Sequence, residues 1–145
     1  MTERILTAEK KAELAAYIRR IACGVVSTVD KSGAPEAAFV FLAVTPGLEI
    51  VFETLNTARK FRNVARDPRV ALVIGWEDDT SLQIEGLAGE PDEFALEELK
   101  PVYYETCPQN RGHLGWPGLT YLRVKPRWLR FSNYGARWRV EEFTL

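Results

Sequence analysis

Short stretches of strand-forming residues, separated by turn residues, restrict the folds that this sequence can adopt. Five such stretches either are rich in β-branched and aromatic residues or alternate apolar with polar side chains: 23–29, 37–44, 48–54, 69–76 and 80–90. Turn sequences at 30–33 and 45–47 join the first three, and Gly33 suits the positive φ of a hairpin loop. The spacing therefore predicts an antiparallel meander followed by further strands.

Helical periodicity is confined to three segments. Apolar residues repeat at helical spacing after Thr7, which can cap a helix there, and further helices are expected at about 57–66 and 92–106. A loop rich in Pro and Gly at 108–118 precedes three last strands, which are expected near 120–125, 127–133 and 137–143. We predict an α+β fold, mainly antiparallel β, in a single domain spanning residues 1–145. A sheet of about eight strands usually closes into a barrel or a sandwich.

Composition limits the classes of function. The formal net charge is −1, which argues against nonspecific binding of nucleic acid, although basic residues concentrate at 59–69 and 123–139. No apolar run is long enough to span a bilayer, and the N-terminus does not resemble a secretory signal, so a cytoplasmic location without membrane attachment is expected. With His113 the sole histidine and Cys23 far from Cys107, no metal site is expected.

Two cations occupy an unfavourable place at the start of the second predicted helix. That helix is expected to begin at Asn56 or Thr57, so Arg59 and Lys60 fall in its first turn. The N-terminal end of a helix already carries roughly half a positive charge, whereas a bound anion would make these cations favourable there. The pattern indicates either an anion site, in which Asn56 or Thr57 could also take part, or a solvated basic helix face.

The residues around this helix resemble those of a known family. Thr54 ends a strand, a short loop follows, Arg59 and Lys60 begin the helix with Asn63 three residues on, and Asp-Pro-Arg-Val-Ala-Leu at 67–72 opens the next strand. This order resembles the pyridoxamine 5′-phosphate oxidase-related split-barrel flavoproteins over about residues 23–90. The resemblance implies an FMN-binding split barrel with about three flanking helices, and a homodimer that holds the cofactor at its interface.

The resemblance also implies roles for seven residues. Arg59 and Lys60 match the pair that holds the FMN phosphate, and Thr54 matches a residue near the ribityl chain and the phosphate. The second-strand segment whose backbone lines the isoalloxazine ring is matched by Phe39, Val40 and Phe41. Ser81 takes the place of a glutamine that contacts the cofactor in the parent oxidases. The side chains at 39–41 could equally be barrel core.

Departures from the family pattern bear on activity. Ala38 and Ala43 replace an arginine and a lysine that flank the flavin segment, and Cys107 replaces an arginine that binds the substrate phosphate. Oxidation of a vitamin B6 phosphate is therefore not expected. We predict an FMN-dependent oxidoreductase acting on a small organic substrate, with no residue identifiable as a catalytic acid or base. The alternatives are a deazaflavin-dependent reductase of the same fold and a non-catalytic barrel that binds flavin or haem.

Overall fold

The computed structural model describes residues 3–145 and contains a single curled sheet with three α-helices. The helices are α1 (Ala8–Ile21), α2 (Arg59–Arg66) and α3 (Glu93–Thr106), with short 3-10 helices η1 (Glu77–Asp79) and η2 (Pro108–His113). The strands are β1 (Glu3–Arg4), β2 (Cys23–Val29), β3 (Pro35–Phe41), β4 (Ala43–Val44), β5 (Ile50–Leu55), β6 (Arg69–Ile74), β7 (Thr80–Gly89), β8 (Leu119–Asn133) and β9 (Arg139–Thr144).

The sheet is almost entirely antiparallel and curls into a split barrel. Its main path runs β1-β9-β8-β7-β6-β2-β3, while β5 pairs with β8 and β4 pairs with β5. The long strand β8 makes this branching possible, because its first half pairs with β5 and its second half pairs with β9. Strand β3 lies close to β5 without pairing with it, so the barrel stays open along that side. The predicted fold class is confirmed.

Two strand boundaries differ from the prediction. The stretch at 37–44, predicted as one strand, is divided at Leu42, because β3 pairs with β2 while β4 crosses to pair with β5. The strands predicted at 120–125 and 127–133 are one continuous strand, β8. A shift of register opposite Glu85 and Gly86 accommodates Pro126, since a bulge tolerates a residue that has no N–H to donate.

Local capping and turn chemistry act as the sequence predicts. The hydroxyl of Thr7 accepts a hydrogen bond from the N–H of Lys10 and caps α1. In the β2–β3 turn, the carboxylate of Asp30 accepts from the N–H groups of Ser32 and Ala34, and Gly33 adopts a φ of 84°. These contacts fix the two elements at the residues where the sequence places them.

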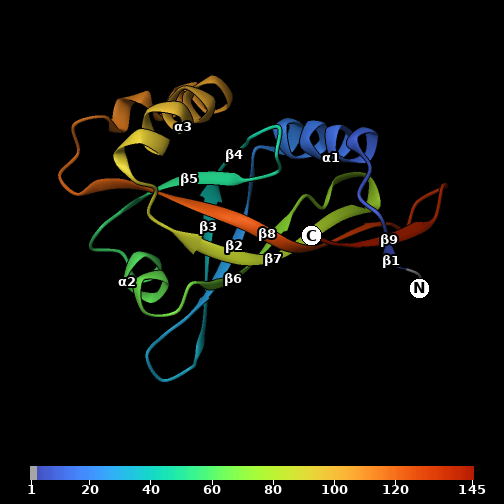
Figure 1. Ribbon diagram of the computed structural model, residues 1–145, viewed down its shortest axis with the longest axis horizontal. Coiled ribbons are helices and arrows are strands. Elements are labelled where there is room, and N and C mark those ends of the chain that lie inside the picture. The colour runs from blue at the N-terminus through green and yellow to red at the C-terminus, as the bar shows by residue number, and fades with distance from the viewer. Residues whose placement is uncertain (1–2) are drawn as a thin grey trace.

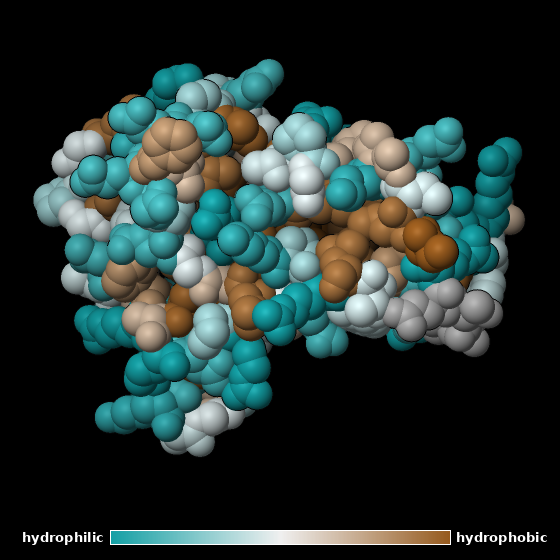
Figure 2. All heavy atoms as spheres, in the orientation of Figure 1, coloured by the Kyte–Doolittle hydropathy of each residue, from teal (hydrophilic) through white to brown (hydrophobic). Residues whose placement is uncertain are grey.

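The helices cover different parts of the sheet, as Figure 1 shows. Helices α1 and α3 lie along one side of the curled sheet, whereas α2 lies beside the base of the β2–β3 hairpin, which projects from the body. The tip of this hairpin is mainly hydrophilic, and apolar side chains gather in a broken band below α1 (Figure 2). Within residues 3–145, no helix is both long and apolar enough to cross a membrane.

Candidate functional site

The start of α2 carries both predicted cations and has no side-chain cap. The helix begins at Arg59, two to three residues later than predicted, and Ala58 occupies the N-cap position without a side-chain hydrogen bond. Asn56 and Thr57 therefore precede the helix and do not cap it. The backbone N–H groups of the first helical turn keep their hydrogen-bonding capacity, and the helix dipole adds a partial positive charge.

Arg59 already has an anionic partner within the chain. Its guanidinium lies 2.6 Å from the carboxylate of Glu36 on β3. The other oxygen of Glu36 accepts a hydrogen bond of 2.6 Å from the side-chain amide of Asn63, which also donates to the hydroxyl of Thr28. Asn63 in turn accepts from Arg66. A connected polar network thus attaches α2 to the β2–β3 hairpin.

Lys60 takes no part in this polar network. Its side chain is half-buried, and among the described residues no carboxylate lies within ion-pair distance of its ammonium group. Burial without a compensating anion lowers the pKa of Lys60 below its ordinary value. A partly desolvated cation beside an uncapped helix start is a local environment that favours an anion.

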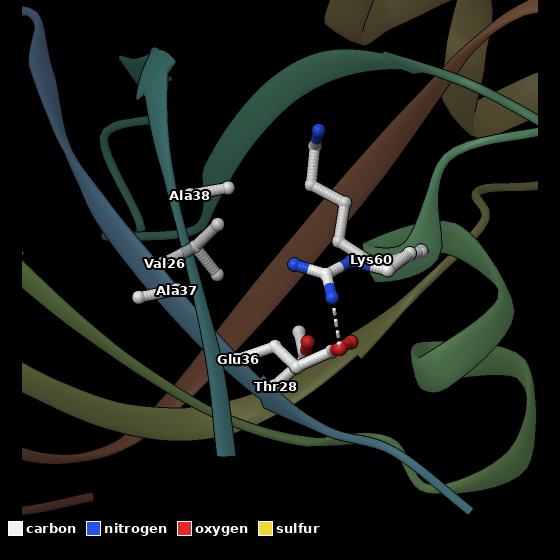
Figure 3. Close-up of a pocket in the computed structure, with 7 residues that line it drawn as sticks. Val26, Thr28, Glu36, Ala37, Ala38 and Lys60 are labelled. Carbon is white, nitrogen blue, oxygen red and sulfur yellow. Dashed lines mark ion pairs between the residues drawn. The ribbon is translucent and has the colours of Figure 1, made fainter.

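These residues line a small pocket, drawn in Figure 3. Its cavity is about 120 Å³ and is lined by Val26, Thr28, Glu36, Ala37, Ala38, Arg59 and Lys60. The side chain of Lys60 extends toward the level of Ala38 and away from the carboxylate of Glu36 (Figure 3). The alanines leave open the space beside it. The pocket suits a small anionic group rather than a whole cofactor, since sites for drug-sized ligands are usually about 300–1,000 Å³.

The chain can be assigned to a family on this geometry together with its sequence. A family model described as pyridoxamine 5′-phosphate oxidase matches residues 11–133, which include the pocket and nearly all of the sheet. The chain belongs to this family. The match extends well beyond the part of the sequence in which the resemblance was recognised.

Individual relatives agree with the assignment. A pyridoxine/pyridoxamine 5′-phosphate oxidase from Rubrobacter xylanophilus is 32% identical over 93 residues, which make up 63% of this chain and 41% of that enzyme. The chain spans less than half the length of the curated relatives that it matches in the pyridoxamine 5′-phosphate oxidase family.

Two solved structures share the fold. A heme binding protein from Mycobacterium smegmatis has a TM-score of 0.78 at 22% identity, over 92% of this chain and 57% of that chain. A general stress protein 26-related protein of the pyridoxinephosphate oxidase family, from Clostridium acetobutylicum, has a TM-score of 0.73 at 13% identity, over 96% of each chain. At these identities the comparison bears on the fold alone.

The remaining residues that the family resemblance singles out lie elsewhere. Thr54 and Val40 are buried, at 6% and 5% exposure. Phe39 and Phe41 are 55% and 43% exposed and lie on the opposite face of β3 from Glu36 and Ala38, because successive strand residues alternate in direction. The two phenyl rings contact each other edge to face at 5.1 Å.

Ser81 lies far from the α2 pocket within one chain. It is the second residue of β7. Its neighbour Leu82 pairs with Ile74 of β6, which pairs with Gly24 at the end of β2 remote from Thr28. The side chain of Ser81 shares the outer face of the sheet with Phe39 and Phe41 by strand alternation. Within one chain, Arg59 and Lys60 line the α2 pocket, whereas Ser81 does not. A contact between Ser81 and the cofactor stays a prediction.

Sequence reasoning missed the carboxylate that pairs with Arg59. Glu36 is separated from Arg59 by more than twenty residues, and only the packing of α2 against the hairpin brings them together. Asn63 belongs to the motif that resembles the family, but the sequence indicated no contact or function for it. The excess of positive charge at 59–69 was the one available signal that a carboxylate from elsewhere in the chain would pair with this helix. Within residues 3–145, no group of three His, Cys, Asp or Glu side chains is arranged to hold a metal ion.

Proposed function

We propose that this chain binds FMN, with the flavin phosphate at the start of α2, and acts as an oxidoreductase on a small organic substrate. The observation that carries the proposal is Lys60, a half-buried cation at an uncapped helix N-terminus that has no carboxylate partner within residues 3–145. An ammonium group in this position gains a charge-assisted hydrogen bond when a phosphate oxygen arrives. Membership of the pyridoxamine 5′-phosphate oxidase family adds support.

The residues at the α2 site fit the phosphate of FMN. The positions at which the parent oxidases have charged residues near the flavin and the substrate do not fit a vitamin B6 phosphate. Lys60, the first-turn N–H groups and the open side of Arg59 can hold an anion. Ala38 and Ala43 contribute no charge near the flavin segment, and Cys107 is fully buried with its thiol directed at the carbonyl of Leu42. Bound FMN would supply the redox chemistry, while this chain would bind, orient and shield it.

We further propose that the functional unit is a homodimer with the cofactor at its interface. The pocket in one chain is too small to enclose an isoalloxazine ring, so a second surface is needed to cover it. The outer face of the sheet offers such a surface, because Phe39 and Phe41 are exposed beside Val25 and Val73 on neighbouring strands. Exposed contiguous apolar groups of this kind are characteristic of protein interfaces.

The α2 site also suits other anionic ligands. A deazaflavin carries phosphate and a planar ring, and a haem carries carboxylates, so either could use Lys60. Nδ1 of His113, the one histidine of the chain, is engaged by Glu53, which leaves Nε2 as the sole imidazole nitrogen for an iron ion. FMN is preferred because the motif around the anion pocket is the part of the chain that most resembles flavin-binding relatives.

The spectrum of the purified protein tests the proposal. Titration with FMN should shift the flavin absorbance and quench its fluorescence at micromolar concentrations, and Lys60→Ala should weaken binding by about 1.5–3 kcal/mol. Lys31→Ala, which removes a cation from the exposed β2–β3 turn, is the matched control and should bind as the wild type does. Uptake of a deazaflavin or haem with no response to FMN would reject FMN as the cofactor. Equal FMN affinity in Lys60→Ala would reject the α2 site.

A further inference from the structure

The outer face of the sheet carries charge as well as exposed phenyl rings. A row of directly paired residues crosses this face from β3 to β8 and consists of Phe39, Val25, Val73, Gln83 and Arg130. The adjacent row consists of Ser27, Ala71, Glu85 and Trp128. The apolar surface around Phe39 is therefore continuous with two opposite charges, those of Glu85 and Arg130.

Arg130 is only partly satisfied within the chain. Its Nε is buried and forms no hydrogen bond within residues 3–145, and the carboxylate of Glu142 lies 3.9 Å away, beyond hydrogen-bonding distance. An arginine side chain has five N–H donors, and a buried donor that stays unpaired is unfavourable. The side chain is 29% exposed. The guanidinium is therefore weakly held within one chain and accessible to an anion from outside.

Glu85 is an anion without a cation of its own. Its side chain is exposed, no cation of the described part of the chain lies within ion-pair distance, and its paired neighbours are Ala71 and Trp128. The carboxylate borders a cavity of about 350 Å³ that Val25, Val73 and Trp128 help to line. An apolar surface that covered this cavity would bury the carboxylate unpaired, at a large cost in free energy.

We propose that Arg130 of one protomer pairs with Glu85 of the partner subunit across the homodimer interface, and that the two-fold axis forms this pair twice. The inference rests on the homodimer of the proposed function and names the contact that selects a second copy of this chain. In a two-fold interface, residue i contacts residue j and residue j contacts residue i.

The positions of the two residues suit such an axis. Glu85 pairs with Trp128, so Arg130 is its diagonal neighbour on β8. A two-fold axis that lies in the interface and bisects the line between Glu85 and Arg130 places each residue opposite the other. The cavity beside Glu85 would then receive the arginine, whose methylene groups can lie on Val25 and Val73 while its charged end meets the carboxylate.

Other charged residues on this face are less suited to the contact. Arg69 lies 2.7 Å from its own partner, Asp67. Glu142 is the neighbour of Arg130 on β9, so an axis that paired these two would pass between β8 and β9, away from the cavity and from Phe39. The diagonal between Glu85 and Arg130 lies between β7 and β8, next to the cavity.

Charge reversal separates a contact between subunits from a contact within one chain. Arg130→Glu and Glu85→Arg each put like charges at both copies of the contact, so each should raise the dissociation constant of the dimer at least about tenfold in sedimentation velocity. An equal mixture of the two variants restores opposite charges at both copies. It should form a heterodimer about as tightly as the wild type forms its homodimer.

Glu142→Arg is the matched control, because it makes the same change of charge on the same face, beside Arg130 in its own chain. Mixed with Arg130→Glu, it leaves like charges at one of the two contacts between subunits. This mixture should therefore associate at least about threefold less tightly than the mixture of Arg130→Glu with Glu85→Arg.

Two results would overturn the inference. One is a dimeric wild type whose dissociation constant changes by less than about twofold in both single variants. The other is a Glu142→Arg mixture that associates as tightly as the Glu85→Arg mixture. If a reversed chain does not fold, Glu85→Gln and Arg130→Gln replace the reversals. Their effects on the dissociation constant should then be non-additive by at least about threefold, and additivity would overturn the inference.

Failure of the proposed function looks different. A chain whose charge variants behave as expected but which does not bind FMN would reject the cofactor and leave the contact standing. A wild type that binds FMN as a monomer would reject the homodimer and this contact with it.

Discussion

The carboxylate of Glu53 on β5 pairs with Nδ1 of His113 in η2, across 60 positions of sequence. The side chain of Glu53 is 9% exposed, and its second oxygen has no hydrogen-bond partner among the described residues. The imidazole stacks on Trp116 with ring centroids 4.0 Å apart. The pair attaches the loop that follows α3 to the strand that precedes α2.

His113→Ala should destabilise the fold, because it leaves the carboxylate of Glu53 buried without a partner. We expect the free energy of unfolding to fall by about 2 kcal/mol, less than for a fully buried pair since His113 is partly exposed. Urea denaturation followed by tryptophan fluorescence measures this. Adding Glu53→Gln to the variant should recover part of the loss, since an amide costs less to bury than a charge. A change below about 0.5 kcal/mol in His113→Ala would mean that the pair contributes little.

Lys60 should make ligand binding depend on pH. Its pKa is lowered by burial in the free protein, and a bound phosphate would raise that pKa again, so binding is favoured when the ammonium is protonated. FMN affinity should therefore decrease as the pH rises through the lowered pKa. Without ligand, the free energy of unfolding should depend on pH in the opposite direction. The native state binds this proton less tightly than the unfolded chain does, so stability rises as the pH rises over that interval.

Fluorescence titrations with FMN from pH 7 to the ordinary lysine pKa of about 10.4 measure this dependence. Lys60→Arg is the matched control, since a guanidinium stays charged throughout that range and should flatten the pH profile. Identical profiles for the wild type and Lys60→Arg would show that Lys60 does not titrate at the site.

Phe39→Asp should dissociate the proposed homodimer. A carboxylate at this position on the apolar outer face would be buried and unpaired in a dimer but solvated in a monomer. Sedimentation velocity should show the wild type as a dimer and the variant as a monomer. Phe94→Asp changes the same residue type at a 79% exposed position on α3 and should leave the mass unchanged. A monomeric wild type would contradict the proposal directly.

Gly86→Ala should strain the bulge that lets β8 run through Pro126. A Cβ at Gly86 would lie 2.4 Å from the carbonyl oxygen of Lys125, and backbone cannot yield as a flexible side chain does. We expect a loss of about 2–3 kcal/mol in the free energy of unfolding. Gly89→Ala, on the same strand with no atom within 4 Å of the added Cβ, should change it by less than about 0.5 kcal/mol. Equal effects at both positions would argue against a strained bulge.

Residues close together in the chain carried most of what could be predicted. The cap at Thr7, the turn closed by Asp30 and Gly33, and the alternation along β7 depend on contacts within a few positions, so a linear pattern reveals them. The alternation predicted for the strand at 48–54 was wrong, because Ile50, Val51 and Phe52 of β5 are all buried. The placement of Arg59 and Lys60 in the first turn of α2 was predictable for the same reason. The strand partners of β4 and the continuity of β8 were not, because they depend on which strand lies alongside.

The sequence by itself determined the strand and helix content, the family and a concentration of cations at one helix. Only the tertiary structure decided which of the two cations in its first turn, Arg59 or Lys60, pairs with a carboxylate. Charge interactions act through space, and Glu36 and Glu53 reach Arg59 and His113 because the curled sheet brings together strands, α2 and η2 that are distant in sequence. One cation is neutralised within the chain and the other is not, and that difference arises from packing.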